Sequence, residues 1–205
     1  WNLSPVLWVV WTAIMVWSTT NAVNVTDGLD GLAAGSALFG FLAFTIIAYW
    51  AFRNPRIYDI VNPLDLAVLS AALAGACGGF LWWNAAPAQI FMGDVGALML
   101  GLLMAVSTSV VGGRADPQLQ GVSGQTYFFI APLFIPLLIL GVPIIDVIFA
   151  IFRRTLSGKG LATADRGHLH HRLIALGHGP RRAVVILWLW TGLFSAFALY
   201  PALTN

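Results

Sequence analysis

Long apolar stretches alternate with short polar segments along this chain of 205 residues. A helix needs about 20 mostly apolar residues to cross a bilayer, within a range of roughly 17 to 25, and it satisfies its own backbone hydrogen bonds there. Stretches of this kind are expected to form membrane-spanning helices at residues 4–20, 32–52, 64–83, 95–112, 126–151 and 183–202. The pattern therefore predicts an all-α, polytopic transmembrane helix bundle with about six spans.

The composition agrees with a single integral-membrane domain over residues 1–205. Hydrophobic residues make up 59% of the chain and charged residues 9%, and the mean hydropathy is +0.85, which excludes an ordinary soluble domain and a disordered chain. The single cysteine, Cys77, excludes a disulfide framework and a cysteine metal cluster. We expect membrane lipids as partners and no nucleic acid.

The distribution of basic residues orients the bundle. Alternating spans place the segments 21–31, 84–94 and 152–182 on one side of the membrane with seven lysines and arginines, against three on the other side. The positive-inside rule makes the first side cytoplasmic in a multi-pass protein of the plasma membrane. Three unusual polar segments are thus expected to meet at the cytoplasmic face.

The first segment reads N-A-V-N-V-T-D-G-L-D-G-L-A-A-G and has polar residues at every third position. These residues are Asn21, Asn24, Asp27 and Asp30. On a helix or a tight 3₁₀ turn each would be a neighbour of the next, so the segment can supply carboxamide and carboxylate ligands to a cation, a sugar or a base. The alternative is a turn in which Thr26 caps a helix and the aspartates lie at its positive end.

The second segment, which includes F-M-G-D-V-G, contains Asn84, Phe91 and Asp94. Magnesium prefers one or two carboxylates together with water and substrate phosphates, so Asp94 with Asn24 would suit it. The alternative role for Asp94 is the N-cap of the following helix. We expect Phe91 in the core, although a ring beside a polar site can also stack on a base.

The third segment includes A-D-R-G-H-L-H-H-R-L, with His168, His170, His171 and Arg172. If it is helical, His168, His171 and Arg172 share a face and His170 does not. A zinc site is one interpretation, but no cysteine or glutamate lies nearby. Seven basic residues against one carboxylate favour a cradle for phosphates, and attraction to lipid headgroups is the remaining alternative.

These three motifs, in this order, closely resemble those of the polyprenyl-phosphate N-acetylhexosamine-1-phosphate transferases, glycosyltransferase family 4. The form H-L-H-H-R-L is more similar to the N-acetylglucosamine branch. The resemblance implies transfer of N-acetylglucosamine 1-phosphate from UDP-N-acetylglucosamine to undecaprenyl or another polyprenyl phosphate, with release of UMP. This would be the first membrane step of cell-wall or surface polysaccharide synthesis. The alternative within the family is the phospho-N-acetylmuramoyl-pentapeptide transferase of peptidoglycan synthesis.

The resemblance also implies roles for individual residues and a magnesium ion, with manganese as the alternative. Asp94 and Asn24 would hold the metal, and Asp27 would border the site as a catalytic residue together with Asp94. His168, His170 and His171 would act on phosphates or sugar. The residues expected to bind substrate, including its uridine end, are Asn21, Asp30, Asn84, Phe91 and Arg172.

One departure from the family concerns an adjacent aspartate pair upstream of the first motif, which this sequence lacks. Together with a start inside the first span, this predicts that the chain is the C-terminal portion of a larger bundle and is inactive alone. An inactive structural homologue is the alternative that this feature favours.

The motifs do not identify the sugar, the lipid length or the downstream polymer. They also do not identify the oligomeric state, for which a homodimer is one possibility.

A membrane transporter is the remaining alternative from another functional class. Transport would place acidic residues near the membrane midplane. Asp146, within the fifth expected span, is placed there, whereas the other acids of the motifs lie at one interface.

Overall fold

The computed structural model describes residues 4–55, 62–112 and 169–204, and these form helices and their connections. The helices are α1 (Pro5–Thr26), α2 (Leu32–Arg53), α3 (Pro63–Asn84), α4 (Gly93–Gly112), α7 (Leu169–Ala175) and α8 (Pro180–Thr204). Five of them are long and apolar enough to cross a membrane. Five expected spans and the all-α class are thereby confirmed, and the chain is a multi-pass membrane protein. The sixth expected span, residues 126–151 with Asp146, lies outside the described residues.

Helix α1 continues past its expected end at residue 20 and stops only at Thr26. Its polar side chains bond to backbone carbonyls of the preceding turn. Thr19 Oγ1 donates to the Met15 carbonyl at 2.8 Å, and Thr26 Oγ1 donates to the Ala22 carbonyl at 2.7 Å. The predicted boundary was wrong because these polar side chains are satisfied by the helix itself.

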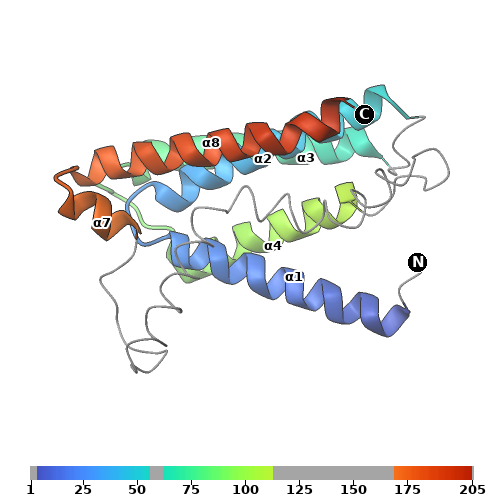
Figure 1. Cartoon of the computed structure of the whole chain (residues 1–205), viewed down its shortest axis with the longest axis horizontal. Helices are drawn as coiled ribbons and strands as arrows, with labels where there is room; N and C mark the ends of the chain where they lie inside the picture. Colours follow the sequence, from blue (N-terminus) through green and yellow to red (C-terminus); the bar gives the residue numbers. More distant parts are fainter. Residues whose placement is uncertain (1–3, 56–61, 113–168, 205) are drawn as a thin grey trace.

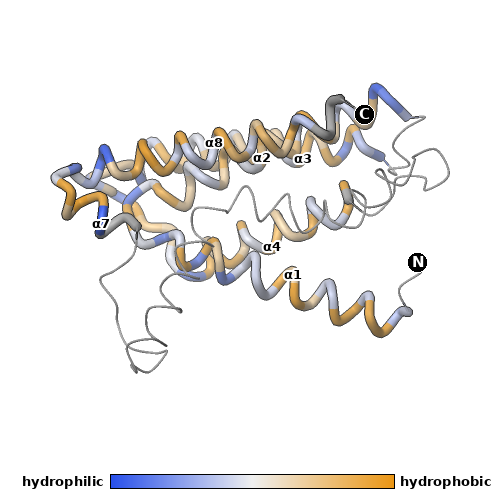
Figure 2. The backbone as a smooth tube through the Cα atoms, viewed as in Figure 1, coloured by the Kyte–Doolittle hydropathy of each residue, from blue (hydrophilic) through white to orange (hydrophobic). Residues whose placement is uncertain are grey.

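Helix α2 is central to the bundle and contacts α1, α3, α4 and α8. Figure 1 shows α2 beside α3 and α8, while α1 and α4 run as a second pair. In Figure 2, hydrophilic residues gather toward the helix ends, including α7 and the α1–α2 connection. The chain therefore presents apolar helix bodies to the membrane and polar connections at its boundaries.

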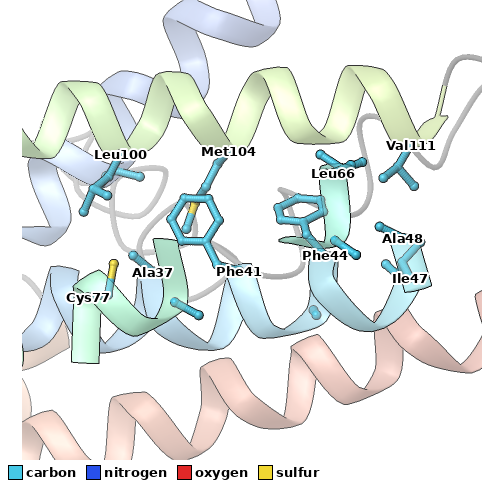
Figure 3. Close-up of a cluster of buried hydrophobic side chains, with 14 of the residues drawn as sticks. Ala37, Phe41, Phe44, Ile47, Ala48, Leu66, Cys77, Leu100, Met104 and Val111 are labelled. Carbon is cyan, nitrogen blue, oxygen red and sulfur yellow. The ribbon is translucent and has the colours of Figure 1, made fainter. Parts of the chain in front are cut away.

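The core lies where α2 meets α3 and α4. Phe41 and Phe44 are fully buried, and Figure 3 shows both rings pointing from α2 toward α4, with Met104 beside them. Leu66 and Cys77 of α3 belong to the same cluster. Lipid tails are as apolar as these side chains, so close van der Waals packing holds such helices together.

Candidate functional site

The turn between α1 and α2 carries two of the predicted acids. Asp27 is the C-cap of α1, and its backbone N–H donates to the Asn24 carbonyl at 3.2 Å. Asp30 precedes Gly31, whose φ of 80° gives the left-handed conformation from which α2 begins. A carboxylate at Asp27 therefore faces the negative end of the α1 dipole. The alternative in which Thr26 caps a helix was wrong, and of the two aspartates only Asp30 lies beside the positive end of a helix, the N-terminus of α2.

Asp27 is half-buried and has neighbours of the same charge. Burial raises the pKa of its carboxyl above the ordinary value of 3.8, and the negative charges of Asp94 and Asp30 raise this pKa further. Asp27 is therefore close enough to Asp30 of its own motif and to Asp94 of the second motif for their charges to act on it. Such a group is suited to attract a cation.

The asparagines of the first motif lie on α1, before the turn. Asn24 is half-buried in the last turn of α1, adjacent to Asp27. Asn21 is exposed, and its Nδ2 donates to the Trp17 carbonyl at 2.7 Å. The expected ridge of polar side chains therefore follows the helix as far as Asp27, and Asp30 lies beyond it because the chain turns there.

Two hydrogen bonds, each from a backbone N–H to a side-chain oxygen, join this turn to the end of α3 and to the loop that follows it. Asn84, which is 2% exposed, accepts from the Gly31 backbone N–H through Oδ1 at 3.0 Å and donates through Nδ2 to the Ile90 carbonyl at 2.9 Å. Asp30 Oδ2 accepts from the Ala88 backbone N–H at 3.0 Å. The expected meeting of the first two motifs is confirmed, and the Asn84 amide makes its bonds within the protein.

The other two predicted residues of the second motif are exposed. Phe91 is 76% exposed, so its expected place in the core was wrong, and its ring is open to a ligand. Asp94 lies in the first turn of α4, which begins at Gly93, rather than at an N-cap position. Its exposed carboxylate has the positive end of the α4 dipole beside it.

The third motif is described only from Leu169 onward, so His168 lies outside the described residues. His170, His171 and Arg172 belong to α7, and Arg172 is exposed. The neighbouring residue Leu173 packs in an apolar cluster with Leu29 and Leu32. This cluster brings α7 next to the turn that carries Asp30.

Two functional candidates on α8 were not predicted as site residues. Arg181 Nε donates to the Ala86 carbonyl at 2.7 Å. A cavity of about 590 Å³ lies between this part of α8 and the two loops, and it is lined by Asp30, Ala86, Pro87, Gly179, Pro180, Arg181 and Arg182. In the sequence both arginines contributed only to the count of positive charge, because nothing there shows which loop they approach.

Within the described ranges, no group of three or more histidine, cysteine, aspartate or glutamate side chains converges to hold a metal ion. The acids of the described residues lie in connections or in the first turns of helices: Asp27, Asp30, Asp65 and Asp94. This placement does not favour a transporter path, which would need acids along the helix bodies. Asp27, Asp30 and Asp94 lie at one membrane boundary and Asp65 at the other, so the acids of the predicted motifs favour chemistry at the first boundary.

Replacing Asp27 by Asn should raise the melting temperature of the full-length protein at neutral pH by a few degrees. The raised pKa means that the folded protein keeps a proton which the unfolded chain has lost, so Asp27 lowers stability as the pH rises from 3.8 through the folded-state pKa. The melting temperatures of wild type and variant should converge in acid and separate toward neutral pH. Thermal unfolding in detergent from the ordinary carboxyl pKa of 3.8 up to neutral pH measures this, with the exposed Asp65→Asn as control. A gain that does not depend on pH would contradict the electrostatic cause.

The sequence also matches known proteins. The model of the family described as Glycosyl transferase family 4 matches residues 1–112. The decaprenyl-phosphate N-acetylglucosaminephosphotransferase of Mycobacterium tuberculosis (strain ATCC 25618 / H37Rv) is 38% identical over 182 residues, which are 89% of this chain and 44% of that protein. The protein of the same name from Mycolicibacterium smegmatis is 36% identical over 193 residues, 94% of this chain and 47% of its own length.

A second group of relatives covers less of the chain at higher identity. The phospho-N-acetylmuramoyl-pentapeptide-transferase of Streptomyces avermitilis is 51% identical over 112 residues, which are 49% of this chain and 31% of that protein. The chain spans less than half of the length of each of these relatives.

Proposed function

Because this chain belongs to glycosyl transferase family 4, we propose that its full-length protein transfers N-acetylglucosamine 1-phosphate from UDP-N-acetylglucosamine to a polyprenyl phosphate and releases UMP. The relatives that cover most of the chain are named for N-acetylglucosamine phosphate transfer with decaprenyl phosphate. The observation that carries the proposal is that the turn with Asp27 and Asp30 is hydrogen-bonded to the segment between α3 and Asp94, where α8 also presents Arg181 and Arg182.

This reaction suits a site where a membrane boundary, carboxylates and arginines meet. An oxygen of the lipid phosphate attacks the phosphorus that carries the sugar, and the bond from that phosphorus to the bridging oxygen of UMP breaks. The products are a lipid–diphosphate–sugar and UMP. Arginine side chains stabilise phosphate charge in such transfers, and the bilayer holds the acceptor phosphate near the site, which reduces the entropy cost of bringing the two substrates together.

We propose Mg²⁺ as the cofactor, with Mn²⁺ as the alternative, held by Asp94 and Asn24 beside Asp27. Magnesium usually takes one or two carboxylates and completes its shell with water and substrate phosphates. The proposal is supported by the charge of Asp94, which acts on Asp27, and by Asn24, which lies in the last turn of α1 just before Asp27. When bound, the ion would neutralise charge on the diphosphate. The remaining predicted residues, His168, His170, His171 and Arg172, are proposed to contact phosphates or sugar.

A second candidate donor is UDP-N-acetylmuramoyl-pentapeptide, because relatives named for that transfer reach 51% identity over part of the chain. The deciding experiment offers each UDP-sugar separately to the purified full-length protein with polyprenyl phosphate and measures UMP. We expect UMP from UDP-N-acetylglucosamine only. UMP from the pentapeptide donor alone would select the second candidate, and UMP from neither would overturn the proposed function.

A further inference from the structure

Both backbone polar groups of Gly31 form hydrogen bonds with side chains of other helices. Its backbone N–H donates to Asn84 Oδ1 of α3 at 3.0 Å, and its carbonyl accepts from Trp188 Nε1 of α8 at 3.2 Å. The two peptide groups that flank Gly31 therefore take their orientation from α3 and α8. Asp30 is the preceding residue, so its backbone is held by the same bonds.

The indole of Trp188 is itself firmly placed. A Cβ atom on Gly35 would lie 2.2 Å from both Cε2 and Nε1 of the indole, so only glycine leaves room for the ring there. The same ring packs with the apolar cluster that includes Leu29 and Leu32, on either side of Asp30. A bulky ring fixed by packing can direct its N–H toward one acceptor.

Helix α8 also holds the α3–α4 loop, through the bond from Arg181 Nε to the Ala86 carbonyl. That loop in turn donates the Ala88 backbone N–H to Asp30 Oδ2. One helix thus contacts both motif loops, about two turns apart along its length. Helix α8 therefore helps to position the Asp30 carboxylate in two ways: through the Trp188 bond to Gly31, and through the Arg181 bond to the loop that donates to Asp30.

We propose that Trp188 is a positioning residue for nucleotide-sugar binding, acting through its indole N–H on the Gly31 carbonyl and so on Asp30, the residue before Gly31. The inference rests on the proposed function, because that function makes the turn with Asp30 part of the substrate site. It extends the site to a helix residue outside the three motifs. A residue of this kind changes the affinity for one substrate more than it changes the chemical step.

The test is Trp188→Phe in the full-length protein, which retains an aromatic ring and removes the N–H donor. We expect the KM for the UDP-sugar to rise about tenfold, with kcat within about twofold, an unchanged KM for polyprenyl phosphate and a melting temperature within a few degrees of wild type. Trp190→Phe is the matched control, because Trp190 is exposed on the same helix and its ring contacts Phe194. This control should behave as wild type.

Amide hydrogen exchange gives a readout that does not require activity. Trp188→Phe should speed exchange in residues 27–32 and leave the middle of α4 unchanged. An unchanged UDP-sugar KM in an active protein, or an equal loss in every kinetic constant together with stability, would overturn the inference. If wild type transfers no sugar phosphate, the proposed function fails, and exchange alone then decides: faster exchange at residues 27–32 supports the anchoring role and unchanged exchange overturns it.

Discussion

Replacing Asp94 by Asn in the full-length protein should reduce UMP release by about 10²–10³-fold at fixed Mg²⁺, the loss typical when one charge-stabilising group is removed from a preorganised site. Asp94 is exposed in the first turn of α4, and its charge raises the pKa of Asp27. An amide keeps the shape of the side chain but binds a hard cation more weakly than a carboxylate. The measurement is the initial rate of UMP release across a range of Mg²⁺ concentrations.

The Mg²⁺ dependence separates a metal ligand from a residue of another role. We expect Asp94→Asn to need more Mg²⁺ for half-maximal activity, and Asp94→Glu, which keeps the charge, to retain more activity than Asp94→Asn. Stabilisation of wild type by Mg²⁺ in thermal unfolding should weaken in Asp94→Asn. UMP release equal to wild type would rule out the metal assignment, and lower activity with an unchanged Mg²⁺ requirement would assign Asp94 another function.

The second large effect is expected at Gly101, where α1 and α4 approach closely. A Cβ atom on Gly101 would lie 2.5 Å from Thr20 Cα and 2.8 Å from the Thr19 carbonyl oxygen. These are backbone atoms, so a rotamer change cannot make room, and α1 has to move. Asp27 lies about two turns beyond Thr20 on α1, and Asp94 lies about two turns from Gly101 on α4, each about 10 Å along its helix.

Gly101→Ala should therefore alter the spacing of Asp27 and Asp94 as well as the packing. We expect UMP release to fall about 10²-fold, since a displacement near 1 Å can have that effect, and the melting temperature to fall by several degrees. Gly75→Ala on α3 is the matched control, because a Cβ there meets no atom within 4 Å. Alanine is also the better helix former, so this control should be neutral or slightly stabilising. A rate unchanged in Gly101→Ala would show that the two carboxylates need no fixed spacing.

Much of the fold follows from local properties of the sequence. The length and polarity of the apolar stretches were sufficient to predict the five described spans, because the bilayer sets one length for every helix that crosses it. The end of α1 was missed, since Thr19, Asn21 and Thr26 bond to carbonyls of their own helix and are tolerated there. Polarity alone does not reveal such internal bonds.

For the candidate site, the sequence by itself determined which acids are the candidates: Asp27, Asp30 and Asp94 stand in motifs at apolar boundaries, and alternation of the spans brings them to one side. Only the tertiary structure decided how they are held. The bonds from Asn84 and Trp188 to Gly31 join residues far apart in the chain. These hydrogen bonds, and the close crossing of α1 and α4 at Gly101, depend on the distance between helices. A sequence pattern shows the periodicity along one helix and does not contain that distance.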